Sequence, residues 1–371
     1  MQNNLFPLDY LSSRQRFRSW EKTISLSWPD TRLVSYPIGS PADDLSIDVL
    51  QSNAGKKNDH LIVLTTGLHG IEGYAGSAMM EFFLQNFLSR LNPETTGFYL
   101  VHTINPWGMK NNQRTNQNNV DLNRNFLYDA QDFSSDNPGY AHFKDFFAPE
   151  RTVHSVFLPS FYARLISLVV CGKKTLFKQA LLSGQYEYPK GLYYGGKEIQ
   201  AETCLMMKLF QDCFSLSKHI VHIDIHTGYG PRYQMSLVHS PFADIASSEY
   251  MMQSGYPRVL QANDAEFYQM KGDMVNYLYI LKEKEYPEAQ LYSSCFEFGC
   301  YGESILAEAK ALWCLIFNNQ MRHYGADKNS APKIQNLWKE AFFPSEPVWR
   351  EKAISDFVLA CTCVLQKQGL I

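Results

Sequence analysis

The sequence predicts an α/β protein built on a doubly wound, mixed but mostly parallel and twisted β-sheet with helices on both faces. Two observations support this fold class. Continuous apolar runs of strand length recur along the chain, which is typical of strands that are covered on both faces. Segments with helical character lie between these runs, and such alternation of strands and helices is typical of doubly wound sheets.

Five apolar runs are interpreted as strands and four segments as helices. In chain order the strands are HLIVLTT at 60–66, GFYLVHTI at 97–104, KHIVHIDI at 218–225, YQMSLVH at 233–239 and LYSSCFEF at 291–298. The helices are expected at about 74–90, 201–216, 303–323 and 347–366. The helices fall between or after the strands, as the fold class requires.

Residues 1–371 are expected to form a single large domain with its core at about 55–325. Of the 371 residues, 45% are hydrophobic and 14% aromatic, so the chain can bury a large core. No linker-like stretch indicates a second domain. Residues 127–200 mix Pro, Gly, Tyr and short apolar runs without clean periodicity, and we expect them to form a long excursion from the sheet.

Charge and composition argue against several classes of partner. The net charge is −3, with acids and bases mixed along the chain, which gives no electrostatic reason to expect binding to nucleic acid or to an anionic membrane. The first twenty residues lack the pattern of a secretory signal, and no apolar stretch approaches the roughly 20 residues needed to cross a bilayer. We therefore expect a cytoplasmic protein with a small or peptide-like partner.

The eight cysteines are scattered along the chain. The near pairs, Cys295 with Cys300 and Cys361 with Cys363, lack the spacing of a zinc knuckle or a redox CxxC motif. We expect free and mostly buried thiols in a reducing compartment. Cys295 and Cys300 flank Glu297, but a nucleophilic thiol needs an activating base and none is evident.

Two histidines and two glutamates lie where three predicted strands end. His69 and Glu72 lie in the glycine-rich stretch TGLHGIEGYAG, His226 closes the strand HIVHIDIH, and Glu297 lies near the end of LYSSCFEFG. Open α/β sheets build their sites just beyond the carboxyl ends of strands. Two histidines and a carboxylate, with a fourth position open for water, make a catalytic site for one Zn²⁺ ion, which suits nitrogen and oxygen ligands.

The HxxE pair alone is weak evidence for a metal. An isolated match is more often an ordinary turn with a solvated Glu72 and a hydrogen-bonded His69. The neighbouring glycines favour the site, because Gly67, Gly70 and Gly73 allow backbone bends that a side chain would forbid.

Arg114 and Arg124 lie in the amide-rich segment NPWGMKNNQRTNQNNVDLNRNF, which begins at a strand end. A guanidinium is well shaped to grip a carboxylate through two hydrogen bonds. One arginine could hold the terminal carboxylate of a substrate, and the other could face a developing oxyanion. The alternative is a polar loop in which Asn and Asp cap turns and the arginines lie in water. This stretch alone does not decide between the two.

The ordered motifs GLHGIEG, NPWG, Arg114, VDLNRNF, DIHTG and FEFGCYG resemble the zinc carboxypeptidase superfamily, the carboxypeptidase A-like metallopeptidases, and a microbial branch of it in particular. The matching motifs run from about residue 60 to 303 and are highly specific together, whereas the flanks at 1–55 and 325–371 match in general character only. The resemblance implies a phosphorylase/hydrolase-like α/β fold and a zinc-dependent hydrolase.

The resemblance also implies the roles of residues around the metal. His69, Glu72 and His226 would bind the zinc ion. Glu297 would be the general base that takes a proton from water and passes it to the leaving amine. Asp121 would accept a hydrogen bond from the ring of His69, and such a partner fixes the tautomer of a ligand histidine.

On the substrate side, the resemblance implies that Arg114 polarises the scissile carbonyl, while Asn123 and Arg124 anchor the carboxylate of a C-terminal residue. Two departures from the family leave points open. The tyrosine of the family's mobile substrate loop has no certain counterpart, and the plausible positions before Glu297 are Tyr268, Tyr277 and Tyr279. The segment TGYGPRYQMSLV keeps no obvious specificity-pocket signature, so the preferred side chain stays open.

Some neighbouring residues admit both a structural and a functional interpretation. His222, Asp224 and His226 share one face of their strand by the period-two rule. We prefer His226 as the ligand because it is nearest the carboxyl end, and we expect His222 to be a packed core imidazole. Asp224 is equally suited to orient a neighbouring side chain or to bond a backbone amide. Tyr193 or Tyr194 in LYYGGKE could reach the cleft or pack in the core.

The predicted function is hydrolysis of an amide bond by zinc-activated water, in a metallocarboxypeptidase that releases a C-terminal amino acid from a short peptide. One alternative is an N-acyl amino acid deacylase, similar to aspartoacylase and succinylglutamate desuccinylase, which uses the same HxxE and histidine ligands. Cell-wall peptides with unusual linkages are a third class of substrate. The alternative from another class is a non-catalytic peptide-binding protein; Glu297 argues against it, because a structural metal needs no proton-transferring carboxylate beside it.

Overall fold

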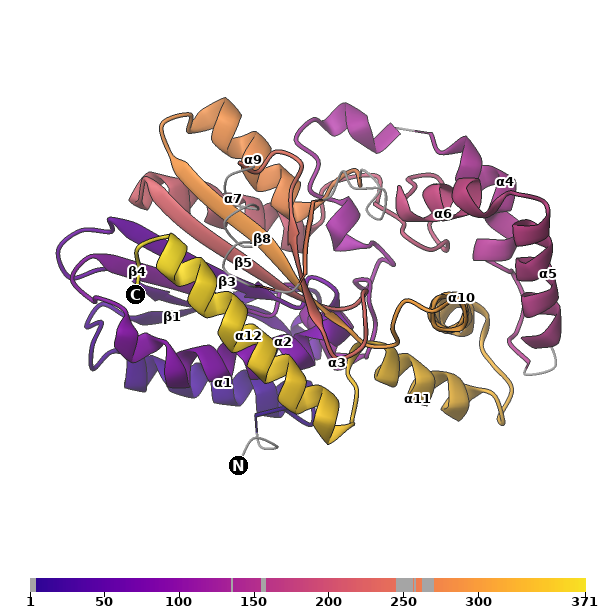
Figure 1. The fold of residues 1–371 in the computed structure, drawn as a ribbon, viewed down its shortest axis with the longest axis horizontal. Helices are drawn as coiled ribbons and strands as arrows, with labels where there is room; N and C mark the ends of the chain where they lie inside the picture. The colour runs from indigo at the N-terminus through magenta and orange to yellow at the C-terminus, as the bar shows by residue number, and fades with distance from the viewer. Residues whose placement is uncertain (1–4, 135, 155–157, 245–255, 257, 262–269) are drawn as a thin grey trace.

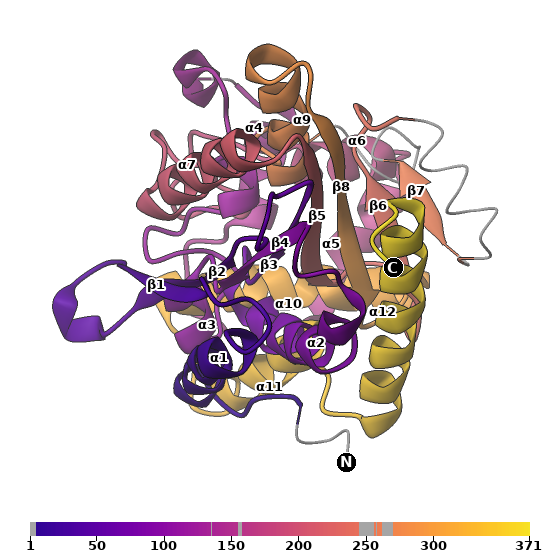
Figure 2. The ribbon, with the colours of Figure 1, turned by 90° about the vertical axis from the view of Figure 1, so that its left-hand side faces the viewer.

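The structure, a computed structural model, describes residues 5–134, 136–154, 158–244, 256, 258–261 and 270–371. Its centre is one eight-stranded sheet with the strand order β1-β2-β4-β3-β5-β8-β6-β7 (Figures 1 and 2). The strands are β1 (Arg32–Pro37), β2 (Ser46–Ser52), β3 (His60–Thr66), β4 (Thr96–His102), β5 (His219–Gly228), β6 (Met235–His239), β7 (Val259–Gln261) and β8 (Gln290–Gly299). The central strands β4, β3, β5 and β8 are parallel, and antiparallel pairs flank them on both sides.

Helices cover both faces of the sheet, which confirms the predicted fold class (Figure 2). One face buries a large apolar cluster under α1 (Tyr10–Ile24), α2 (Gly73–Asn86) and α12 (Pro347–Lys367). The opposite face packs against α7 (Ala201–Leu216) and α9 (Met274–Glu285). The central strands therefore have no face turned to water, which explains why their sequences are apolar without interruption.

Side chains of β5 alternate between these two faces. Val221, Ile223 and Ile225 belong to the cluster under α2 and α12. His222, Asp224 and His226 alternate with them, so the three polar side chains point to the other side of the sheet. All three are buried, and each therefore needs a polar partner inside the protein.

A third apolar cluster lies beyond the sheet, on the right of Figure 1. It is formed by α4 (Pro138–Phe147), α5 (Leu158–Val170), α6 (Lys174–Leu182), α10 (Ile305–Tyr324) and α11 (Ala331–Phe342). The described residues of 127–200 contribute no strand to the sheet. They form α4, α5 and α6, and the phenylalanine-rich interior of this cluster joins them to α10.

Short helical turns lie in the connections between the longer elements. They are α3 (Pro106–Lys110) and the 3₁₀ turns η2 (Pro41–Asp43), η3 (Gly70–Glu72), η4 (Leu88–Arg90), η5 (Leu122–Arg124) and η6 (Ala130–Ser134). The η3 and η5 turns matter for the site, since η3 follows β3 directly and η5 carries the NR dipeptide of the VDLNRNF motif.

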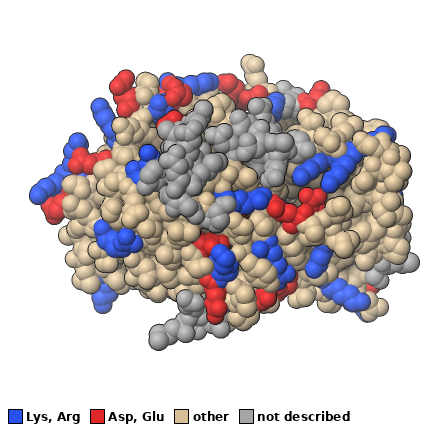
Figure 3. Space-filling model, in the orientation of Figure 1, with Lys and Arg blue, Asp and Glu red and all other residues tan. Residues whose placement is uncertain are grey.

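The structure adds elements that the apolar runs do not predict. β1, β2 and α1 lie before residue 55 and belong to the sheet and its covering layer. All eight cysteines are free, and five of them are buried. Within the described ranges no helix is both long and apolar enough to cross a bilayer. Acidic and basic side chains are interspersed over the face shown in Figure 3.

Candidate metal centre

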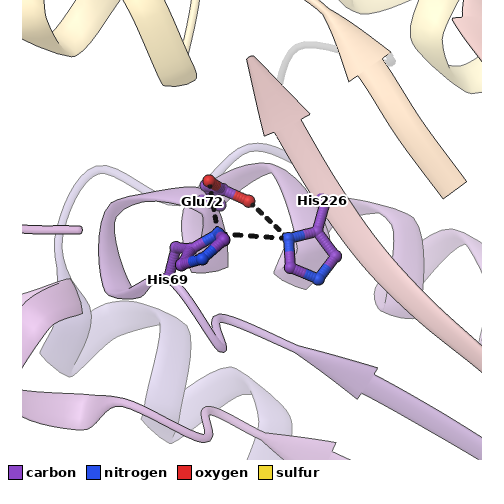
Figure 4. A group of neighbouring side chains, drawn as sticks. All are labelled: His69, Glu72 and His226. Atoms are coloured by element: carbon purple, nitrogen blue, oxygen red, sulfur yellow. Dashed lines mark hydrogen bonds and ion pairs between the residues drawn. The ribbon is translucent and has the colours of Figure 1, made fainter. Parts of the chain in front are cut away.

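His69, Glu72 and His226 meet beyond the carboxyl ends of the central strands (Figure 4). His69 is the N-cap residue of η3, and Glu72 ends η3 where α2 begins. His226 lies in β5, the strand beside β3. All three side chains are buried, with exposures of 4%, 1% and 4%. The short path from β3 through η3 thus brings the HxxE pair next to a histidine from a neighbouring strand.

The ligand atoms of these residues face one another. Nδ1 of His69 lies 2.9 Å from Oε1 of Glu72 and 3.2 Å from Nδ1 of His226. Nδ1 of His226 lies 3.0 Å from the other carboxylate oxygen, Oε2 of Glu72. One atom of each residue is within 4.8 Å of the others, so a single ion can touch all three.

The outer nitrogen of each imidazole faces a carboxylate. Nε2 of His69 lies 3.1 Å from Oδ1 of Asp121, and Nε2 of His226 lies 2.5 Å from Oδ2 of Asp224. A carboxylate accepts a hydrogen bond, so each Nε2 carries the proton and each Nδ1 keeps a lone pair. Asp121 therefore lies where the prediction places it, and the question left open for Asp224 is answered by its contact with His226.

This donor set fits a divalent cation. With both imidazoles in this tautomer, two nitrogen lone pairs and a carboxylate point at one small space, and they repel one another unless a positive charge lies between them. Two nitrogens and a carboxylate oxygen are the ligands of catalytic zinc sites. Positive charge on the imidazoles of His69 and His226 acts in the same way as an ion: it outweighs the burial of Glu72 and holds the pKa of the Glu72 carboxyl group far below its usual range.

Glu297 lies beside this cluster on the next strand. It is the register partner of His226 in the parallel pair of β5 and β8. Its Oε1 accepts a hydrogen bond of 3.0 Å from the backbone N–H of Tyr229. Burial and the nearby carboxylate of Glu72 raise the pKa of Glu297 to about 7. A carboxyl group with such a pKa can both accept and release a proton near neutral pH.

Arg114 is held close to the metal ligands. Its Nε and Nη2 each lie 3.2 Å from Oδ2 of Asp121, and its Nη1 lies 3.4 Å from Oε1 of Glu72. Asp121 therefore contacts both Arg114 and His69, which ties the guanidinium to the imidazole.

Arg124 is almost fully buried, at 2% exposure, and has no ion pair with any carboxylate in the described part of the chain. Its guanidinium donates to the backbone oxygens of Asn123 at 2.8 Å and Leu182 at 2.9 Å. The Nε–H finds no partner among the described residues. A buried cation without a counterion is costly, so this position favours an anionic ligand.

Asn123 is bound at both ends of its amide. Its Nδ2 donates to Oδ2 of Asp273, and its Oδ1 accepts from the backbone N–H of Met274, both at 3.0 Å. Asn123 thus holds the N-terminus of α9 against η5.

A cavity of about 220 Å³ joins these side chains. Of the eight site residues predicted from the sequence, the structure brings seven to its wall: His69, Glu72, Arg114, Asn123, Arg124, His226 and Glu297. Asp121 lies behind them, against His69 and Arg114. The remaining wall mixes apolar and polar side chains, among them Val238, His239, Ser240, Asp273 and Phe342.

The prediction that three glycines between β3 and α2 allow bends that a side chain would forbid is correct for Gly67 only, since Gly70 and Gly73 have no left-handed φ. Gly67 has a φ of +67°, a left-handed conformation that favours glycine. Gly70 is needed for close packing, since a Cβ atom there would lie 2.2 Å from the backbone of Gly108 and Met109 in α3. The turn that carries the HxxE pair is therefore pressed directly against α3.

The structure also settles several open positions. His222 hydrogen-bonds Thr65 and Ser293 and does not reach the cluster. Tyr277 and Tyr279 are buried in apolar clusters and do not line the cavity, while Tyr268 is outside the described residues. Tyr193 lines the cavity, whereas Tyr194 packs in the core. The sequence signal for Tyr193 was only its place before two glycines.

Several solved structures are similar to this chain. Bovine thrombin-activatable fibrinolysis inhibitor, in complex with tick carboxypeptidase inhibitor, matches with 15% identity and a TM-score of 0.46 over 93% of this chain and 96% of that chain. Carboxypeptidase A from Helicoverpa armigera matches with 12% identity and a TM-score of 0.43 over 88% and 73%. A Shewanella amazonensis protein assigned to the succinylglutamate desuccinylase/aspartoacylase family matches with 15% identity and a TM-score of 0.40 over 78% and 72%.

These proteins are of the kinds that the sequence motifs resemble, but likeness of this degree carries no information about the reaction. A comparison with curated proteins finds no match. One family model matches residues 6–356, which include all eight predicted site residues. The chain therefore belongs to the family described as protein of unknown function (DUF2817).

Proposed function

We propose that this protein is a zinc-dependent hydrolase that cleaves an amide bond and releases the C-terminal amino acid of a short peptide. One observation carries the proposal. The cavity that holds three converging ligand atoms and Glu297 also holds a buried guanidinium, Arg124, with no ion pair among the described residues. A metal site, a base and an anion-binding group in one cavity are the parts that a carboxypeptidase needs.

His69, Glu72 and His226 would hold the ion. Zinc in such a site polarises a carbonyl group and makes water more acidic. Asp121 and Asp224 keep each imidazole in the tautomer whose Nδ1 lone pair is free. The two aspartates therefore act on the reaction through the histidines they contact.

Glu297 would take the proton of the attacking water and pass it to the leaving nitrogen. Its position next to His226 and its raised pKa of about 7 support this role. Arg114 would donate to the oxyanion that forms when the carbonyl carbon is attacked. Asp121 already holds the guanidinium of Arg114 in place, so little order has to be created when the substrate binds.

Arg124 would receive the carboxylate of the substrate. Two of its amino groups donate to backbone oxygens, and its Nε–H is still unpaired among the described residues. Asn123, the second predicted carboxylate contact, uses one Nδ2 hydrogen on Asp273 and has the other left for a ligand. We therefore propose Arg124 as the main anchor, with Asn123 beside it.

Deacylation of an N-acyl amino acid is the second candidate, because the cavity is small. Its volume of about 220 Å³ is below the range of roughly 300–1,000 Å³ typical of ligand sites. A single acylated amino acid carries the same carboxylate for Arg124 and needs less room than a peptide. The two candidates differ in what lies on the far side of the scissile amide.

The test is a mass-spectrometric screen of dipeptides, tripeptides and N-acyl amino acids with zinc-loaded protein. We expect release of C-terminal amino acids from peptides, loss of activity with a chelator, and recovery with zinc. Glu297→Gln should keep the metal and lose turnover, while Glu288→Gln, at an exposed position, should match the wild type. Cleavage of N-acyl amino acids but not of peptides would favour the deacylase over the carboxypeptidase. Full activity in metal-free protein would reject both candidates.

A further inference from the structure

Tyr193 occupies an unusual position between the two arginines of the cavity. The ring centroid of Tyr193 lies 5.2 Å from Cζ of Arg114 and 5.1 Å from Cζ of Arg124. Both distances are within the range in which a guanidinium is attracted to an aromatic ring. One aromatic ring thus contacts both like charges.

The backbone of Tyr193 is held in a conformation that tyrosine rarely adopts. Its φ is +51°, in the left-handed region, which is costly for a residue with a bulky side chain. Its carbonyl accepts from the N–H of Gln185 at 3.1 Å, and the next carbonyl, of Tyr194, accepts from the N–H of Asp121 at 2.7 Å. The first bond ties the segment to the residues after α6, and the second ties it to the loop that carries the arginines.

This conformation sends two successive tyrosines in different directions. Tyr194 is 6% exposed and packs in the cluster under α7 and α9. Tyr193 lines the cavity instead, and its hydroxyl has no hydrogen-bond partner among the described residues. Burial raises the pKa of Tyr193 above its ordinary value although both arginines oppose this. The hydroxyl therefore keeps its proton and has it available for a ligand.

We propose that Tyr193 is a substrate-binding residue, whose ring sets the spacing of Arg114 and Arg124 and whose hydroxyl donates a hydrogen bond to the carboxylate held by Arg124. The proposal rests on the proposed function in one respect, namely that the ligand of Arg124 is a carboxylate. It gives the left-handed backbone a role, since in this conformation Tyr193 lines the cavity while Tyr194 stays in the core.

Binding of carboxylates that cannot be hydrolysed tests this proposal without turnover. Calorimetry on the zinc-loaded protein uses four probes that differ in the side group: butanoate, 3-phenylpropanoate, 6-aminohexanoate and glutarate. The tightest binder is then measured with the variants. We expect Tyr193→Phe, which keeps the ring, to weaken binding about tenfold or more, as for loss of a hydrogen bond to a charged group. Tyr193→Leu should weaken it further because it also removes the ring that both guanidinium groups contact.

Two controls separate this role from a structural one. Tyr194→Phe removes the same hydroxyl from the neighbouring residue and should bind like the wild type. In an Arg124→Gln background, Tyr193→Phe should have almost no further effect, because the carboxylate is no longer held beside the tyrosine. Circular dichroism and thermal unfolding confirm that each variant is folded.

Each outcome bears on the proposal. Binding by Tyr193→Phe within about twofold of the wild type, an equal loss in the Arg124→Gln background, or no binding of any probe to the wild type overturns it. Failure of the proposed function looks different: carboxylates would bind with the expected dependence on Tyr193, but no amide would be cleaved.

Discussion

Nε2 of His226 lies 2.5 Å from Oδ2 of Asp224, a close contact between the imidazole and the carboxylate. The other oxygen of Asp224 accepts from Oγ1 of Thr65 at 2.6 Å. Thr65 also lies 2.9 Å from Nε2 of His222, whose Nδ1 is 2.7 Å from Oγ of Ser293. A buried chain of hydrogen bonds thus crosses β3, β5 and β8 and ends at a predicted metal ligand.

Replacement of Asp224 by Asn should weaken metal binding. The amide cannot supply a carboxylate to the ring of His226, so the tautomer with a free Nδ1 lone pair loses its support. Loss of such an outer partner typically lowers metal affinity by about 10- to 100-fold. Competition with a chromophoric chelator measures this. Asp212→Asn, on the exposed side of α7, is the matched control, and equal zinc affinity in both variants would contradict the role of Asp224.

The Thr65 hydroxyl should matter for both stability and metal binding. Thr65→Val keeps the shape of the side chain but removes one hydrogen-bond partner from Asp224, which keeps His226, and one from His222, which keeps Ser293. We expect a loss of about 1–3 kcal/mol in the free energy of unfolding and weaker zinc binding. Thr65→Ser retains the hydroxyl and should restore most of both. Denaturant unfolding gives the stability, and the same chelator competition gives the zinc affinity. Normal zinc affinity in Thr65→Val would show that this chain of hydrogen bonds does not support the metal ligands.

Glu297 should make the metal-free protein less stable as the pH rises. Its pKa is about 7 in the folded chain against an ordinary value of 4.5. Between these values the folded state keeps a proton that the unfolded state has lost, so a rise in pH from 5 to 8 removes stability. Glu297→Gln cannot lose this proton. The stability gained by the substitution should therefore be small at pH 5 and larger at pH 8, and a gain that is constant with pH would argue against the raised pKa.

A methyl group at Gly70 should disturb the metal site, because η3 packs against α3 at this position. Its Cβ would meet the backbone of α3 at 2.2 Å, so η3 would have to move away and take the HxxE pair with it. We expect Gly70→Ala to lower stability by about 1–3 kcal/mol or more and to reduce zinc affinity. In Gly55→Ala the nearest contact of the Cβ would be the end of the flexible Glu94 side chain at 3.3 Å, so neither quantity should change. Similar values for the two variants would show that η3 tolerates the shift.

The strands that carry the site were predictable because both of their faces are covered. β3, β5 and β8 are apolar enough to be recognised from sequence alone, and a polar residue at the end of such a strand is conspicuous. β1 and β2 are harder to recognise because RLVSYP and SIDVLQS carry polar residues along their length and not only at the strand end. β7, with three residues, gives almost no signal.

The position of the metal ligand His226 was easier to predict than the contacts that hold its ring in place. The period of a strand places Asp224 on the same face as His226, but it does not say which group the carboxylate contacts. The position of Tyr193 beside the arginines depends on a segment that follows α6 and returns to the cavity. Such long-range contacts arise from tertiary packing, which local patterns do not encode.

The position of β5 between β3 and β8 also constrains how the protein is made. His69 and Glu72 emerge from the ribosome early, but His226 can join them only after β5 has been synthesised and has paired with β3. A growing chain therefore offers only a weak, two-residue site for most of its translation. The proposed three-ligand site is therefore completed only when the polypeptide is well past its midpoint.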